Sequence, residues 1–249
     1  MPSKINPKEK DPVYYAVSQD IFAKLPTACF GAVAVRGLDN TRPQPELEAM
    51  LQENIAACEA YFEGVKPKES PAIVPYREAF RALDINPNKF LCSIEALLTR
   101  IAKGKGFPTI NGIVDLGNAI SIKYRLPIGA HDLDTIDNGL DVRMAVEGDT
   151  FIAFGETTEE TPDVGEAIYA SGNEVRTRRW TWRQSERGKI TEETKAVLFP
   201  IDGFADVNKA EVYEAIEEFK VLLHRFFGDD IEVATGFVDA ENPKFTFFE

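Results

Sequence analysis

The order of periodic patterns along the chain constrains its fold more than any other sequence feature. Helix-type patterns occupy the first half, short strand-like runs cluster after residue 140, and a last helix-type pattern covers 209–227. This segregation favours an α+β fold over alternating strand–helix units. The clearest helical pattern lies at 46–62, where apolar residues recur every three or four positions: Leu47, Met50, Leu51, Ile55, Cys58 and Phe62.

Capping and turn residues bound the other expected elements. Helices are predicted over 76–83, from Ser93 to Ile101 and from Asn111 to Tyr124, because Ser and Asn are typical helix caps. Apolar or alternating runs between Gly, Pro and acidic loops predict strands over 29–35, 142–145, 150–154, 174–184 and 196–201.

Length and composition narrow the class of protein. A chain of 249 residues, 44% of them hydrophobic, predicts one globular domain with elaborations. No run approaches the ~18 apolar residues that cross a bilayer, and the polar N-terminus lacks the apolar region of a secretory signal. The spacing of Cys29, Cys58 and Cys92 fits neither a zinc motif nor a disulfide framework, which favours the reducing cytoplasm.

Charge and missing motifs exclude several functions. A net charge of −13 argues against a protein that binds DNA or long RNA through its phosphates. A local basic patch could still bind one end of an RNA. Phosphate-loop, G-x-S-x-G and H-E-x-x-H motifs are absent. With only His131 and His224, a His-rich metal site is excluded, and neither a metal nor a cofactor is expected.

The first candidate region surrounds a predicted Pro–Gly turn. A helix carrying Asn118 leads into the turn at 126–130, which presents backbone N–H groups and then His131, Asp132 and Asp134. Loops held by rigid elements expose polar groups in a fixed geometry, as active sites require. The structural alternative is that Asn118 is a surface residue and both Asp residues cap the next element.

The second candidate region, 174–189, holds both tryptophans of the chain and six basic residues: Arg176, Arg178, Arg179, Arg183, Arg187 and Lys189. Interpreted as one strand, it places on one face Arg176, Arg178, Trp180, Trp182 and Gln184. Arginine beside tryptophan can stack on a base or hold a phosphate. The structural alternative is a half-buried strand with its tryptophans in the core and its arginine heads in solvent.

The first region resembles the editing domain of the bacterial phenylalanyl-tRNA synthetase beta subunit, which that subunit's third and fourth modules form. The family pattern V-D-x-T-N, a short gap and Q-P-x-H-A-x-D-L corresponds here to 114–118 and 126–133, and 194–198 is similar to the closing strand. The resemblance implies a layered β-sandwich with packed helices in a single unit. Its parts would be a loose tail at 1–12, an N-terminal elaboration at 13–69, a core at 70–204 and a closing helix and strand at 205–249.

The chain is more similar to free-standing versions of this domain. Four blocks carry that likeness: 76–80 (YREAF), 93–97 (SIEAL), 126–134 (LPIGAHDLD) and 180–185 (WxWRQS). These relatives include a deacylase that removes canavanine from arginine tRNA. The resemblance implies a cytoplasmic trans-editing hydrolase that acts on the tRNA 3′ end and has no DNA or membrane partner. No oligomeric state is predicted.

The resemblance also implies site residues. Asn118 would orient the water or the ester carbonyl, and the turn with Gly129 and Ala130 would donate backbone N–H groups beside His131. The synthetase domain has its editing histidine where this chain has Gly129, and a threonine where this chain has Gly117. Its glutamate falls near Pro200. Glu95, Asp132 and Asp134 are expected partners for a guanidinium-like substrate. The other expected substrate-binding residues are Tyr76, Arg77, Arg178, Trp182, Arg183 and Gln184.

Two further functions stay open at this point. A non-catalytic tRNA- or protein-binding module of the same fold is favoured by the missing histidine and glutamate. A hydrolase of a small anionic metabolite would use the arginine-rich segment and would be active without tRNA.

Overall fold

The computed structural model describes residues 13–248, so the predicted tail at 1–12 lies outside the described part. The helices are α1 Gln19–Lys24, α2 Pro45–Tyr61, α3 Val74–Ala82, α4 Ser93–Ala102, α5 Gly112–Tyr124 and α6 Lys209–Phe227, with short 3-10 turns η1 Pro67–Glu69 and η2 Leu133–Thr135. The strands are β1 Val13–Val17, β2 Ala28–Arg36, β3 His131–Asp132, β4 Gly139–Met144, β5 Phe151–Ile152, β6 Glu159–Glu160, β7 Ala167–Ser171, β8 Glu174–Arg178, β9 Arg183–Gln184, β10 Ala196–Phe204, β11 Glu232–Val238 and β12 Lys244–Phe247.

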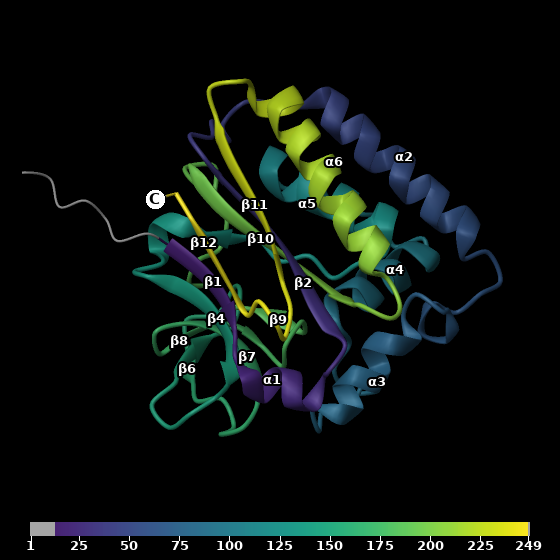
Figure 1. The fold of residues 1–249 in the computed structure, drawn as a ribbon. Helices are drawn as coiled ribbons and strands as arrows, with labels where there is room; N and C mark the ends of the chain where they lie inside the picture. The colour runs from purple at the N-terminus through teal and green to yellow at the C-terminus, as the bar shows by residue number, and fades with distance from the viewer. Residues whose placement is uncertain (1–12, 249) are drawn as a thin grey trace, which may run out of the picture.

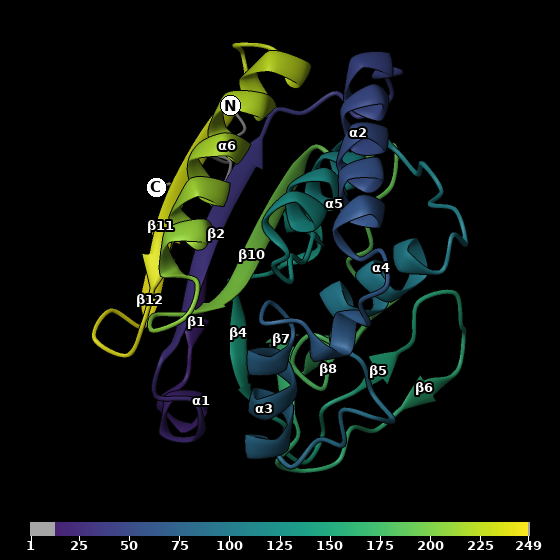
Figure 2. The same ribbon diagram turned by 90° about the vertical axis from the view of Figure 1, so that its right-hand side faces the viewer.

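Two β-sheets and a group of helices form the layers of the fold (Figure 1). One sheet has the order β12-β1-β4-β7-β8-β9, the other β11-β2-β10-β3, and β5 pairs with β6. Helix α6 lies along the second sheet, and α2 packs on α5 (Figure 2). The arrangement confirms the predicted α+β class with layered sheets and packed helices. Between residues 13 and 248, no helix has the length and apolar character to cross a membrane.

Strand β2 is apolar without alternation because both of its faces are covered. Its odd-numbered residues Cys29, Val33 and Val35 belong to the core shared with α5 and α6. Its even-numbered residues, such as Phe30, belong to the core shared with the six-stranded sheet. Strand β10 alternates in the same way, so Asp202 lies on the side of that strand that faces the other sheet.

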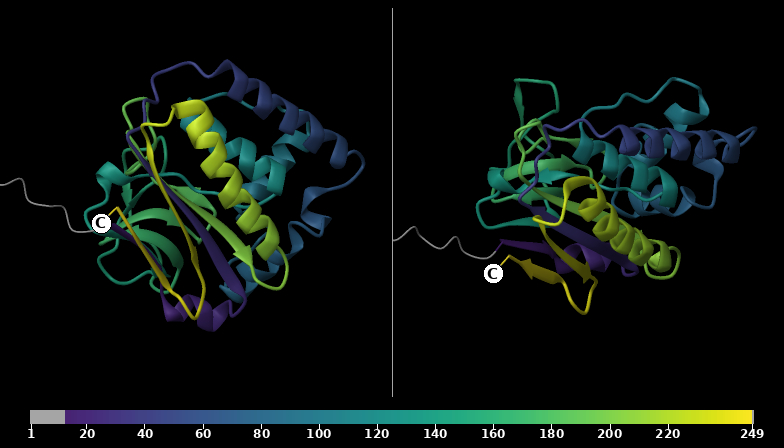
Figure 3. Two further views of the ribbon diagram at one scale, coloured as in Figure 1. Left: turned by 45° about the horizontal axis from the view of Figure 1, so that its top comes forward. Right: turned by 90° about the horizontal axis from the view of Figure 1, so that it is seen from above.

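The hairpin of β11 and β12 connects the two sheets. β11 pairs with β2 and β12 pairs with β1, so the closing segment belongs to both layers (Figure 3). One strand was expected after α6, and the structure has two. Strand β1 and helix α1 were not predicted either, because each is only five or six residues long.

Helix α5 is fixed at both ends by local contacts. The Asn111 Oδ1 accepts a hydrogen bond from the Val114 N–H at 3.1 Å, which confirms the predicted cap. At the other end Arg125 adopts a left-handed conformation, with φ of 57°. The prediction for α4 was wrong in detail, because Cys92 occupies the cap position and Ser93 is the first helical residue.

The prediction of one strand over 174–184 was also wrong. Arg179 and Trp180 have φ of 47° and 58°, and this left-handed pair separates β8 from β9. The turn lets the Trp180 ring enter the core, where its Nε1–H donates to Asp202 at 2.7 Å. The five side chains expected on one face therefore do not share one. The strand expected at 150–154 is likewise shorter, reduced to β5.

Candidate functional site

The larger of two adjoining cavities, here called the outer cavity, has a volume of about 530 Å³. Helices α4 and α5, the segment 107–110 and the turn at 128–130 form much of its wall. The rest comes from β9 and from Phe154, Trp182, Lys189 and Ile190. The cavity brings together six predicted residues from the two candidate regions: Asn118, Gly129, Ala130, Trp182, Arg183 and Gln184. A hydrogen bond from Gln184 Nε2 to the Ala130 carbonyl, 2.8 Å long, links the two regions directly.

The lining of the outer cavity is basic and partly apolar. Arg100, Arg183 and Lys189 line it and no Asp or Glu does, although the chain has 41 acidic and only 28 basic residues. Carboxylates lie just behind this lining, because Lys189 pairs with Glu186 and Arg183 lies 3.9 Å from Glu156. Two of its lining side chains are large, apolar and unusually exposed, Ile110 at 60% and Phe154 at 57%. An anion with an attached flat or apolar group matches this lining.

Polar donors without protein partners lie along the same wall. Within residues 13–248, no hydrogen bond uses the Asn118 amide or the Ala130 N–H. The Gly129 N–H, in contrast, donates to the Pro200 carbonyl at 3.0 Å. The expectation that Gly129 supplies a free backbone donor is therefore wrong, whereas the Ala130 N–H has no such bond. A side chain at Gly129 would begin 3.1 Å from His131 Nε2, which explains the glycine by packing.

The second cavity, here called the inner cavity, has a volume of about 140 Å³. It shares four lining residues with the outer cavity: Ile128, Gly129, Trp182 and Gln184. Six of its eight other lining residues carry a polar side-chain group: Ser93, His131, Tyr169, Thr177, Thr181 and Asp202. The two cavities therefore meet at the Pro–Gly turn.

Asp202 is the only carboxylate that lines the inner cavity. Its Oδ1 accepts hydrogen bonds from the Tyr169 hydroxyl at 2.5 Å and from Trp180 Nε1 at 2.7 Å. Burial raises the pKa of Asp202 from 3.8 to about 7. His131 stacks on Tyr169, and burial lowers the pKa of His131 to about 3, so its imidazole is neutral at physiological pH.

Several residues expected at the site lie outside both cavities. Arg77 and Glu95 form a buried ion pair at 2.7 Å. The Asp132 carboxylate accepts from the Thr194 hydroxyl at 2.7 Å and from the Asp134 N–H, while the Asp134 side chain is exposed. None of Glu95, Asp132 and Asp134 lines a cavity where a guanidinium-like substrate could reach it.

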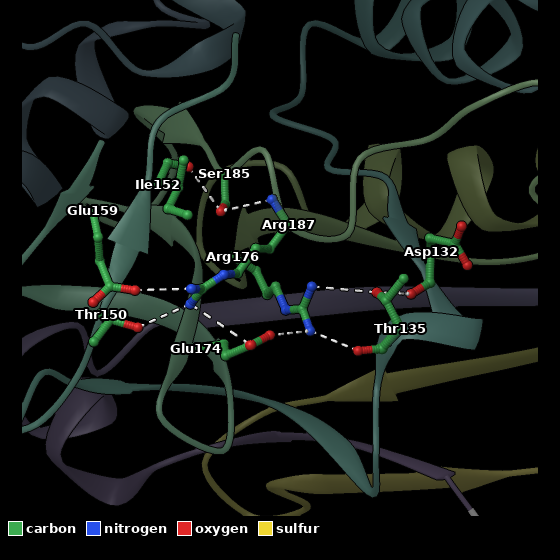
Figure 4. A network of polar contacts seen from close by, with 9 residues as sticks. All are labelled: Asp132, Thr135, Thr150, Ile152, Glu159, Glu174, Arg176, Ser185 and Arg187. Carbon is green, nitrogen blue, oxygen red and sulfur yellow. Dashed lines mark hydrogen bonds and ion pairs between the residues drawn. The ribbon is translucent and has the colours of Figure 1, made fainter. Parts of the chain in front are cut away.

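Tyr76 lies behind the inner cavity, where its hydroxyl donates to the Asp202 carbonyl at 2.9 Å. Arg178 holds Glu166 through Nε and Nη2 at 2.9 and 2.8 Å, a fork that leaves it no free face. Arg176 and Arg187 are likewise bound to protein acceptors, including Thr135 and Glu159 (Figure 4). Most of the arginine cluster therefore holds neighbouring loops in place.

Sequence reasoning missed four residues of the two cavities that now matter: Arg100, Phe154, Tyr169 and Asp202. Asp202 carried a signal, because a carboxylate inside the apolar run 196–204 is costly unless it has a special partner or role. Arg100 and Phe154 carried none, since they come from different segments that only the fold brings to one cavity. Across residues 13–248, no cluster of three His, Cys, Asp or Glu side chains could hold a metal ion.

Comparison with known proteins places the chain in a family. The sequence model of the B3/4 domain matches residues 75–228. One of 17 matching solved chains is an N-terminal fragment of the phenylalanyl-tRNA synthetase beta-subunit from Pyrococcus horikoshii, with 13% sequence identity and a TM-score of 0.48. The match covers 94% of this chain and 53% of that one, so this chain spans about half of its length. No curated protein matches. Because the family model covers more than half of the sequence, the chain belongs to the B3/4 domain family, as its resemblance to the synthetase editing domain predicted.

Proposed function

We propose that the protein hydrolyses the ester between an amino acid and the 3′ end of a mischarged tRNA. The observation that carries this proposal is the outer cavity: basic residues line it without any carboxylate, beside the unpartnered amide of Asn118. In a protein with a net charge of −13, such a cavity is complementary to one short stretch of phosphodiester.

The cavity lining suits a single-stranded RNA end. Arg100, Arg183 and Lys189 would contact phosphates, which position a nucleic acid without reading its sequence. Phe154 and Trp182 offer aromatic faces on which a base can stack. A double helix is far wider than a cavity of about 530 Å³, so the terminal nucleotide enters alone.

Hydrolysis here needs positioning more than a strong base. The water oxygen bonds to the carbonyl carbon, the ester bond to the ribose oxygen breaks, and that oxygen receives the proton. Asn118 would orient the water or the ester carbonyl, and the Ala130 N–H would stabilise the oxyanion. The outer lining contains neither His nor a carboxylate, and in our proposal the neighbouring ribose hydroxyl therefore assists by relaying the proton.

A panel of mischarged tRNAs tests the proposal. Total tRNA is charged separately with many amino acids, including canavanine on arginine tRNA, which the resemblance to free-standing deacylases suggests. The expected result is fast release of one amino acid or a small group of them. Release of none from the whole panel contradicts the proposal, and hydrolysis of esters without tRNA would favour a metabolite hydrolase.

Removing one basic side chain from the outer cavity should weaken tRNA binding. Arg183→Ala and Lys189→Ala are each expected to raise Kd severalfold and to lower the slope of log K against log salt by about 1. Filter binding of uncharged tRNA at several salt concentrations measures both. Arg81→Ala, an exposed arginine on α3 outside the cavity, serves as the matched control. Equal losses in all three variants would count against phosphate binding in the cavity.

A further inference from the structure

The two sides of the outer cavity differ in what their cations contact. On the β9 side, Lys189 pairs with Glu186, and Arg183 lies 3.9 Å from Glu156. On the α4 side, Arg100 forms no ion pair with any residue between 13 and 248, and its guanidinium donates to backbone carbonyls of the loop that follows α4. The α4 side therefore keeps positive charge that no carboxylate of the described chain neutralises.

The loop at 103–106, here called the lysine loop, carries this charge beyond the cavity. Its sequence is Lys-Gly-Lys-Gly, and both lysines are exposed. The cavity is lined by Arg100 before the loop and by Phe107 directly after it. Arg100 also fixes the loop, because its Nε donates to the Gly106 carbonyl at 2.7 Å and its Nη2 to the Lys105 carbonyl at 3.4 Å. A residue of the cavity wall thus holds two exposed lysines at the edge of the cavity.

The sequence around the lysine loop contains no acidic residue. From 96 to 114 the chain has three cations and no Asp or Glu, although 41 of its 249 residues are acidic. The ion pairs that lysines form within residues 13–248 involve neither Lys103 nor Lys105. In an acidic protein, such a stretch keeps a local positive potential that attracts an anion.

The opposite edge of the cavity presents negative charge instead. The segment 155–163 follows directly on the cavity wall and has four acidic residues and no basic one. Within it, Glu159 accepts a hydrogen bond from Arg187 at 2.8 Å. Glu160 accepts one from Arg178 at 2.9 Å. The α4–α5 connection and the β5–β6 hairpin lie on the same side of the molecule (Figure 2), so a polyanion there is attracted at the first and repelled at the second.

We propose that bound RNA leaves the outer cavity over the α4 edge, and that the lysine loop binds the phosphates that precede the terminal nucleotide. This inference rests on the proposed function, which places only that last nucleotide inside the cavity. The RNA chain before it carries about one negative charge per nucleotide and must cross one edge, where unpaired lysines offer a counter-charge that ion-paired arginines do not. Such contacts hold any RNA end alike, because they do not depend on base sequence.

The decisive variant replaces both lysines of the loop, Lys103→Ala/Lys105→Ala. We expect it to raise the Kd for uncharged tRNA about tenfold and to lower the slope of log K against log salt by about 2, because two phosphate contacts are lost. Lys209→Ala/Lys220→Ala, at two exposed lysines of α6 outside the cavity, changes the net charge equally and should leave Kd within about twofold. Filter binding at several salt concentrations compares both variants with the wild type.

A tRNA without its terminal adenosine separates the loop from the cavity. The loop variant should still weaken binding of this shortened RNA about tenfold, whereas Arg183→Ala, inside the cavity, should no longer weaken it. An unchanged Kd for whole tRNA, an equal loss in the α6 control, or a loop effect that disappears with the terminal adenosine overturns the inference. The expected losses in a protein that releases no amino acid from any charged tRNA would support the loop while contradicting the hydrolase.

Discussion

Asn118→Ala is expected to lower kcat/KM for release of the preferred amino acid by at least about 100-fold. Asn118 is a partly exposed polar residue on the α5 wall of the outer cavity, and no protein group uses its amide. Alanine removes the group that orients the water or the ester carbonyl, without disturbing the buried face of the helix. Binding of uncharged tRNA should stay within about twofold, since the phosphate contacts remain.

Single-turnover release of labelled amino acid measures the effect, and filter binding measures tRNA affinity. Asn173→Ala, an exposed asparagine in the turn between β7 and β8, is the matched control and should leave both unchanged. A variant at Asn118 that keeps full activity would remove this residue from the mechanism. A wild-type protein that binds charged tRNA but never releases the amino acid would be a binding module with the same fold.

Asp202→Asn is expected to stabilise the folded protein at alkaline pH. The pKa of Asp202 rises from 3.8 to about 7 on folding, so the folded protein holds more protons than the unfolded chain between these values. This group therefore makes the free energy of unfolding fall as pH rises from about 4 to about 7, and the loss is complete above that range. Asparagine has no such titration.

The rise in the pKa of Asp202 from 3.8 to about 7 corresponds to a gain of about 4 kcal/mol at pH 8, or about 8–16 °C in Tm for a chain of this size. At pH 4 both proteins carry a neutral group at this position, and the difference should nearly vanish. Differential scanning calorimetry at the two pH values measures it, with Asp137→Asn, at an exposed aspartate outside both cavities, as the control. A stability difference of equal size at both pH values would show that the buried charge is not its cause.

Local patterns predicted the elements that depend on neighbours in sequence. Helix α5 was predicted with its Asn111 cap, because the cap contacts Val114, only three residues away. The break between β8 and β9 could not be predicted, since a Trp in left-handed conformation is favoured here by distant contacts, such as its hydrogen bond to Asp202 and its packing on Phe80. The local conformational propensity of a residue does not reveal its backbone conformation where tertiary packing determines that conformation.

The candidate site was predicted in part for the same reason. Asn118 and the Pro–Gly turn belong to one continuous segment, so their proximity followed from the sequence. Glu95, Asp132 and Arg178 have residue types that suit a substrate, but each has a partner inside the protein that sequence does not reveal. Asp202, the buried carboxylate of the inner cavity, was not among the predicted site residues.

The separation of the two cavities by a shared glycine-bearing wall has an evolutionary consequence. Under the proposed function, the outer cavity would hold what every tRNA end has in common, and the smaller inner cavity lies beyond the turn that the two share. Exchange of a few inner residues such as Thr177, Thr181 and Asp202 would then alter one cavity while Asn118 and Ala130 keep their places in the other. Relatives of this chain could diversify in this way by changing one compartment only.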